Sequence, residues 1–181
     1  MIYVDAPTYV KMDQAHIALI HGMTLALKPE QILELGIGSG AVTSALLNAV
    51  TYNGCGKITV VDNWFDWNGV RPEIKGLPHS ATVSIIDGDE QTIVREWTPG
   101  TVDLIVSDAD HMNAHKWFLT TMGLLTKSGV AFFHDVTNPM FPNLNTMTGK
   151  AKQHGYSYYV FNKNSLAQEQ CQRGLLMVFQ K

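Results

Sequence analysis

The sequence predicts an α/β fold in which helices cover both faces of a doubly wound sheet of about seven strands, mostly parallel with a C-terminal antiparallel hairpin. Two observations support this prediction. Short apolar runs alternate with segments of helical period, and most of these runs close on glycine or acidic residues. The chain also has 181 residues, of which 45% are hydrophobic, enough for one core. We therefore expect a single domain over residues 1–181.

The first predicted element is a helix. Apolar residues recur with a helical period over residues 12–27, Asp13 is a suitable N-cap, and Pro29 follows the end. Residues 1–28 are thus expected to form an N-terminal helical cap. This cap would either cover the substrate opening or mediate contact in a homodimer, and the sequence leaves both alternatives open.

Strands and helices then alternate through residue 133, which indicates βαβ units and a parallel sheet. Near the C-terminus two strand-like runs follow each other without a convincing helix between them, which predicts the hairpin. The expected strands span residues 31–35, 57–61, 81–86, 102–106, 129–133, 156–161 and 174–179. The expected helices between them span residues 41–50, 90–97 and 112–125.

Composition excludes several classes of partner. Lys and Arg number 13 against 16 Asp and Glu, a formal net charge of −3, so no basic stripe is available for nucleic acid. No apolar run is long enough to span a membrane, and the first residues do not resemble a secretory signal. Cys55 and Cys171 form no C-x-x-C pair, which is typical of reduced thiols. We expect a soluble cytoplasmic protein with a small-molecule substrate.

A glycine-rich turn follows the first predicted strand. Gly36, Gly38 and Gly40 alternate there, and Ser39 precedes the last of them. Glycines allow a tight turn and let backbone N–H groups approach a ligand closely. The turn therefore predicts a cofactor site, although a turn that serves only helix packing would look the same.

Three features favour S-adenosylmethionine over a dinucleotide, whose loose fingerprint the turn also satisfies. Glu34 stands where a carboxylate would attract an ammonium group but repel a pyrophosphate. Gly40 makes a third alternate glycine. The chain is also too short for a separate substrate domain.

Acidic residues end the second and third predicted strands. Asp62 could accept hydrogen bonds from both ribose hydroxyls, and Asp87 from an adenine amino group beside the flexible Gly88. Asp62 could instead cap the following segment, and Asp-Gly is also an ordinary turn dipeptide.

This ordered set of residues resembles the class I S-adenosylmethionine-dependent methyltransferases, and the resemblance covers residues 27–181. It implies a Rossmann-like sheet and specific roles for the residues. Glu34 would meet the methionine part of the cofactor, with the turn from Gly36 to Gly40 beneath it. Asp62 would hold the ribose, and Asp87 with Gly88 would border the adenine.

Polar residues also close the fourth and fifth predicted strands, whose ends should lie about 5 Å apart at the same sheet edge. Alternation in an extended chain would place Asp108 and Asp110 on one side, with His134 and Asp135 nearby. Crowded carboxylates repel each other unless a proton or cation lies among them, so a hard divalent ion is a natural partner.

These strand ends resemble those of the metal-dependent O-methyltransferases of the catechol and caffeoyl-coenzyme A type, which carry Asp-x-Asp and then Asp-Asn. His134 and Asp135 replace that second pair, a form closer to the small bacterial methyltransferases that include proteins described as cephalosporin hydroxylases. The resemblance implies Asp108, His134 and Asp135 as ligands of Mg²⁺ or another divalent metal. Alternatively, His134 and Asp135 bind loop backbone and Asp108 only caps the next helix.

The expected chemistry is methyl transfer to oxygen. A sulfonium methyl is electrophilic, so the protein has to align a nucleophile and remove its proton. The expected catalytic residues are Asp108, His134 and His111, and either histidine could act as general base without a metal. A plain surface position is the alternative for His111. A dinucleotide-dependent oxidoreductase and a non-catalytic cofactor-binding module remain the other hypotheses for the whole chain.

Overall fold

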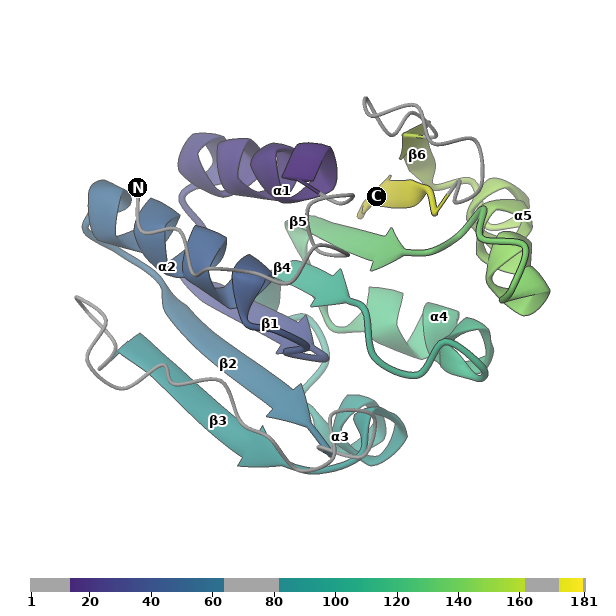
Figure 1. Cartoon of the computed structure of the whole chain (residues 1–181), viewed down its shortest axis with the longest axis horizontal. Coiled ribbons are helices and arrows are strands. Elements are labelled where there is room, and N and C mark those ends of the chain that lie inside the picture. The colour runs from purple at the N-terminus through teal and green to yellow at the C-terminus, as the bar shows by residue number, and fades with distance from the viewer. Residues whose placement is uncertain (1–13, 64–81, 162–172, 181) are drawn as a thin grey trace.

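The computed structural model describes residues 14–63, 82–161 and 173–180. Within these ranges it contains a seven-stranded sheet of order β3-β2-β1-β4-β5-β7-β6 (Figure 1). Neighbouring strands from β3 to β5 are parallel, and β7 is antiparallel to both β5 and β6, as the sequence predicts. The strands are β1 (Gln31–Leu35), β2 (Lys57–Asp62), β3 (Val83–Asp87), β4 (Val102–Ser107), β5 (Leu125–His134), β6 (Ser157–Phe161) and β7 (Leu175–Phe179).

Helices cover both faces of this sheet, because residues within each central strand alternate between two cores. Ile32 packs with Ile20 and Leu46 on the face of α1 and α2, whereas Leu33 packs with Phe118 on the face of α3, α4 and α5. Figure 1 shows the two layers on either side of the sheet. The helices are α1 (Gln14–Leu27), α2 (Ala41–Asn53), α3 (Glu90–Glu96), α4 (Ala114–Gly123) and α5 (Thr146–Gln153), with a short 3₁₀ helix (Pro142–Asn145) before α5.

Several boundaries differ from the sequence expectation by one to four residues, and the beginning of β5 differs most. Helix α4 ends at Gly123 instead of residue 125, and β5 begins at Leu125 instead of residue 129. Leu125 pairs with Val102, after which the register of β4 and β5 shifts. The polar residues before Gly129 break the apolar run, so the sequence shows only the later part of β5.

Helix α5 is absent from the sequence prediction. Only Met147 and Ala151 of its residues are buried, so the apolar period is too sparse to indicate a helix. The N-cap expected at Asp13 lies outside the described residues. No helix within the described ranges is long and apolar enough to cross a membrane.

The carboxyl ends of the parallel strands meet at one edge of the sheet, and backbone hydrogen bonds continue just beyond them. Gly36 N–H donates to the carbonyl of Val61 at 2.8 Å, and Asp108 N–H donates to that of Leu35 at 2.8 Å. Gly88 N–H donates to the carbonyl of Asp62 at 3.1 Å. The residues that follow β1, β3 and β4 are therefore held next to each other.

The opposite edge is fastened by one carboxylate. Asp103, on β4, accepts hydrogen bonds through Oδ2 from the N–H groups of Glu30 and Gln31, both at 3.0 Å. Its Oδ1 accepts from Thr126 Oγ1 at 3.0 Å. A single side chain thus joins the beginnings of β1 and β5 to β4.

Replacing this carboxylate should destabilise the sheet without touching its functional edge. We expect Asp103→Ala to lower the free energy of unfolding by about 1–3 kcal/mol, because two backbone donors and one hydroxyl lose their acceptor. Urea denaturation would measure the change. Thr126→Ala, which removes only one of the three hydrogen bonds, is the matched control and should lower the free energy of unfolding by less. Equal stabilities of Asp103→Ala and wild type would contradict the stabilising role of Asp103.

Candidate functional site

The glycine turn lies directly between β1 and α2, and its first glycine is required by a close contact. Gly36 has φ +89°, and a Cβ built there would lie 2.6 Å from the carbonyl oxygen of Asp108. Gly40 caps the N-terminus of α2 with φ 79°, a left-handed conformation that favours glycine. Gly36 therefore excludes any side chain, the backbone conformation at Gly40 favours glycine, and the turn passes close to the end of β4.

Asp62 fastens the turn from the neighbouring strand. It ends β2, and its Oδ2 accepts a hydrogen bond from Ile37 N–H at 2.9 Å. This bond holds the carboxylate beside the glycines, in a half-buried position. Asp62 and the turn therefore form one wall.

That wall belongs to a large hollow of about 650 Å³ at the carboxyl edge of the sheet. Its size falls within the roughly 300–1,000 Å³ usual for small-molecule sites. Gly38, Asp62 and Gly88 line one part of it, and Asp108 and His111 line another. One hollow thus joins the predicted cofactor residues to the predicted catalytic residues.

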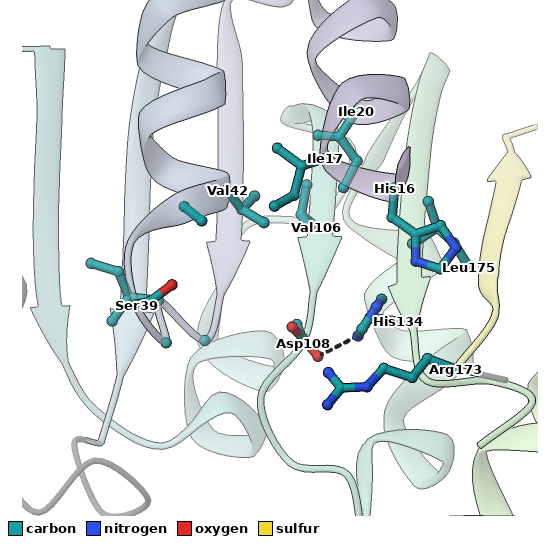
Figure 2. A pocket seen from close by; sticks show the side chains of 14 residues that line it. His16, Ile17, Ile20, Ser39, Val42, Val106, Asp108, His134, Arg173 and Leu175 are labelled. Atoms are coloured by element: carbon teal, nitrogen blue, oxygen red, sulfur yellow. Dashed lines mark hydrogen bonds and ion pairs between the residues drawn. The ribbon is translucent and has the colours of Figure 1, made fainter. Parts of the chain in front are cut away.

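A smaller hollow of about 110 Å³ also includes Asp108 in its lining (Figure 2). Its walls come from α1, the glycine turn and the ends of β4 and β5. They are largely apolar, with Ile17, Ile20 and Val42 beside His134. The part of the predicted N-terminal cap that the structure describes therefore borders the site.

Four side chains converge where β4 and β5 end. One ligand atom each from Asp108, His111, His134 and Asp135 lies within 4.8 Å of the other three. Asp108 Oδ1 lies 3.1 Å from both His111 Nε2 and His134 Nδ1. Asp135 Oδ2 lies 2.9 Å from His111 Nε2 and 3.7 Å from His134 Nδ1. Figure 2 shows the contact between Asp108 and His134.

Attraction between opposite charges dominates this cluster. Burial opposes the ionised form of Asp108, but the neighbouring His134 and His111 hold the pKa of that carboxyl well below its usual range. Burial likewise lowers the pKa of His111, yet hydrogen bonds to Asp108 and Asp135 outweigh it and raise that pKa to about 10. The protonated ring of His111 thus balances the carboxylates of Asp108 and Asp135. A divalent cation could supply the same positive charge.

A backbone change lets consecutive residues join the same cluster. His134 is the last residue of β5, and Asp135 has φ 59° in the left-handed region. Asn138 stabilises this turn, because its side-chain amide donates to Asp135 Oδ1 at 3.1 Å and its backbone N–H to Asp135 O at 3.0 Å. The chain therefore leaves strand geometry where the convergence of His134 and Asp135 requires it.

Asp110 lines the large hollow together with Asp108, as expected, but it does not join the cluster. Asp110 instead accepts hydrogen bonds from the N–H groups of Met112 and Asn113, at 3.1 and 3.0 Å, just before α4. This turn swings Asp110 away and brings His111 into the cluster, so neither the surface position for His111 nor the capping role for Asp108 holds. The side chain of His111 is 26% exposed, and its ring packs 4.6 Å from that of Phe141.

Three predicted cofactor residues, Glu34, Gly40 and Asp87, do not line either hollow. Glu34 is buried behind the turn, where Oε1 accepts from Thr43 Oγ1 at 3.0 Å. Its Oε2 has no hydrogen-bond partner among the described residues, and burial raises the pKa of this carboxyl to about 8. Asp87 is exposed, and the next residues, Gly88 and Asp89, line the large hollow instead.

Sequence reasoning missed two charged residues at the site. Glu90 is buried, accepts from Ser107 Oγ at 3.1 Å and Asp110 N–H at 3.0 Å, and so holds the end of β4. Arg173, before β7, lines both hollows. Neither residue belongs to a motif. The sequence indicates them only through position: Glu90 is at the beginning of a predicted helix, and Arg173 directly precedes a predicted strand.

Comparisons with known proteins agree with this geometry. Residues 33–136, more than half of the chain, match the family described as "Methyltransferase domain". No curated protein matches the sequence.

Several solved structures share the fold. A methyltransferase from Podospora anserina, bound to S-adenosylhomocysteine, has 17% identity and a TM-score of 0.73 over 98% of this chain and 83% of its own. An O-methyltransferase from Bacillus cereus, in complex with the same compound, has 15% identity and a TM-score of 0.69 over 97% and 83%. The O-methyltransferase TomG from Streptomyces achromogenes, in complex with S-adenosylmethionine, has 15% identity and a TM-score of 0.66 over 100% and 93%.

The buried Glu34 should make stability depend on pH in the ligand-free protein. Its carboxyl keeps a proton up to about pH 8 when folded but releases it near pH 4.5 when unfolded. The folded chain then binds more protons between these values, so the free energy of unfolding should fall as pH rises through this window. Glu34→Gln, which cannot ionise, should show a smaller fall between pH 5 and pH 8 in urea denaturation.

Glu30→Gln is the matched control, because it changes an exposed side chain near the beginning of the same strand. It should keep the pH dependence of the wild type. A wild-type slope in Glu34→Gln as well would show that Glu34 ionises normally in the fold.

Proposed function

The chain belongs to the methyltransferase-domain family, and from this membership we propose that it transfers the methyl group of S-adenosylmethionine to an oxygen atom of a small molecule. One observation carries the proposal. The glycine turn with Asp62 and the cluster around Asp108 line a single hollow, so a cofactor and an acceptor can meet there. The solved structures with this fold, two of them O-methyltransferases, support the same reaction class.

The proposed cofactor site combines the turn with the ends of β2 and β3. Asp62 would accept hydrogen bonds from the ribose hydroxyls, and Gly88 would leave space beside the adenine. Gly36, Gly38 and Ser39 would pass beneath the methionine part. Behind them, Glu34 is proposed to hold Thr43 and thereby the first turn of α2.

The cluster of Asp108, His111, His134 and Asp135 fits a divalent metal ion. It offers two carboxylate oxygens and two imidazole nitrogens, one more nitrogen than the sequence predicts. Imidazoles suit transition ions, whereas Mg²⁺ prefers oxygen ligands, so we propose Mn²⁺ or a similar ion ahead of Mg²⁺. When bound, such an ion would lower the pKa of an acceptor hydroxyl and orient it.

The chain's own residues have two tasks in the proposed mechanism. The sulfonium supplies an electrophilic methyl group. The residues around Asp108 would hold the acceptor oxygen in line with that methyl group. A base then has to take the acceptor's proton. His134, whose side chain lines the small hollow beside Asp108, is the proposed base when no ion is present.

The other hypotheses receive less support. A dinucleotide-dependent oxidoreductase is not favoured, because the match to the methyltransferase domain includes the glycine turn. A non-catalytic module has no evident use for two carboxylates and two histidines at the edge of the hollow.

We further propose that the protein is cytoplasmic. We also propose that it does not bind nucleic acid, because Asp62, Asp89 and Asp108 line the large hollow and would repel phosphates. Contact of α1 with the small hollow supports a covering role ahead of homodimer contact.

Calorimetry tests the cofactor assignment. The protein should bind S-adenosylhomocysteine and ignore NAD, because the turn and Asp62 suit a nucleoside without a pyrophosphate. Asp62→Ala should weaken binding by roughly 1.5–3 kcal/mol, the value of hydrogen bonds to a charged group. Asp87→Ala, on the neighbouring strand end but outside the hollow, is the control and should bind as wild type does. NAD binding without a response to the thioether would overturn the proposal.

Metal titration tests the cluster separately. Mn²⁺ added to the metal-free protein should bind at one site, and electron paramagnetic resonance would measure this binding. Asp108→Asn should weaken this binding at least about tenfold, since outer or inner ligand changes commonly cost that much. Asp110→Asn, two residues away and engaged in the turn before α4, should leave it unchanged. Equal affinities in Asp108→Asn and wild type would remove the ion from the proposal.

A further inference from the structure

The two hollows meet at a small set of residues. Only four of the described lining residues belong to both, and they are Gly36, Gly38, Asp108 and Arg173. The first three were expected at the site from the sequence. Arg173 comes from the segment before β7 and has no role in the mechanism above.

The backbone of Arg173 is held firmly. Its carbonyl accepts a hydrogen bond from Thr137 N–H at 3.1 Å. The next residue, Gly174, has φ +64° and lies so close to Thr137 that a Cβ there would be 2.3 Å from Oγ1. This packing fastens Arg173 to the loop that follows the metal cluster.

The side chain of Arg173 points into the site. Figure 2 shows it extending from the segment before β7 toward Asp108, beneath His134. It is 26% exposed, and its Nε lies 3.9 Å from Asp135 Oδ1, at the outer limit of an ion pair. The guanidinium thus reaches the place where the two hollows join.

Charge makes this position distinctive. Arg173 is the only Arg or Lys among the described residues that line either hollow. Carboxylates line much of the rest, namely Asp62, Asp89, Glu90, Asp108 and Asp110. An anionic group of a ligand would be repelled along most of the hollow. Among the described lining residues, Arg173 and the protonated His111 would attract it, and His111 is already paired with Asp108 and Asp135.

We propose that Arg173 binds the carboxylate of the methionine part of S-adenosylmethionine, an inference that rests on the proposed function. With the ribose at Asp62, the rest of the cofactor would pass over Gly36 and Gly38 and reach the junction of the two hollows. The planar guanidinium suits a carboxylate because it donates two parallel hydrogen bonds. Arg173 would then set the position of the sulfonium relative to Asp108.

The test compares two nucleosides that differ in this tail. S-Adenosylhomocysteine carries the carboxylate, whereas 5′-methylthioadenosine lacks the whole amino-acid part. In calorimetry, Arg173→Met should weaken S-adenosylhomocysteine binding about 10- to 100-fold, the loss expected for a charge-assisted hydrogen bond. It should leave 5′-methylthioadenosine binding unchanged. Arg173→Lys, which keeps the charge but not the fork, should lose less affinity.

Arg95→Met is the control, because Arg95 lies on α3 over the ring of Trp117 and lines neither hollow. It should bind both nucleosides as wild type does. Equal losses for the two nucleosides in Arg173→Met, or no loss for either, would overturn the inference; the latter would point to an anionic acceptor instead. If the wild-type protein bound neither nucleoside, both the proposed function and this inference would fail. If it bound the two nucleosides with equal affinity, only the inference would be overturned.

Discussion

The close approach of Gly36 to the backbone of Asp108 is the constraint on which the site depends. It exists because β1 and β4 are neighbours in the sheet and Asp108 N–H donates to the carbonyl of Leu35. No side chain fits between the two strands at this point. The glycine turn and the acidic end of β4 are consequently in direct contact. This contact places the proposed methyl donor beside the proposed catalytic cluster.

Electrostatics at this edge are arranged in two zones. Behind the turn, Glu34 keeps its proton because burial outweighs its hydrogen bond to Thr43. In front of it, Asp108 stays ionised because two imidazoles surround it. Two carboxyl groups so close to each other therefore differ in charge, which avoids repulsion beneath the turn and leaves negative charge where a cation can bind.

Most of the fold was predictable because buried parallel strands are short apolar runs whose polar ends share one sheet edge. The same rule brought Asp108, His134 and Asp135 together. Local turns were not predictable in this way: whether Asp110 or His111 faces the cluster depends on which one caps the turn before α4. Arg173 was missed because its position follows from the antiparallel pairing of β7 with β5, and a residue before an edge hairpin carries no motif.

The left-handed backbone of Asp135 gives this position two separate requirements. The side chain has to supply an oxygen to the cluster, and the main chain has to adopt φ 59° at low cost. Glycine would satisfy the second requirement alone and glutamate only the first, whereas aspartate and asparagine are the residues that combine an oxygen with tolerance of this conformation. The residue types that this position can accept are therefore limited to aspartate and asparagine. An alanine there would alter the backbone path and remove the oxygen from the cluster at the same time.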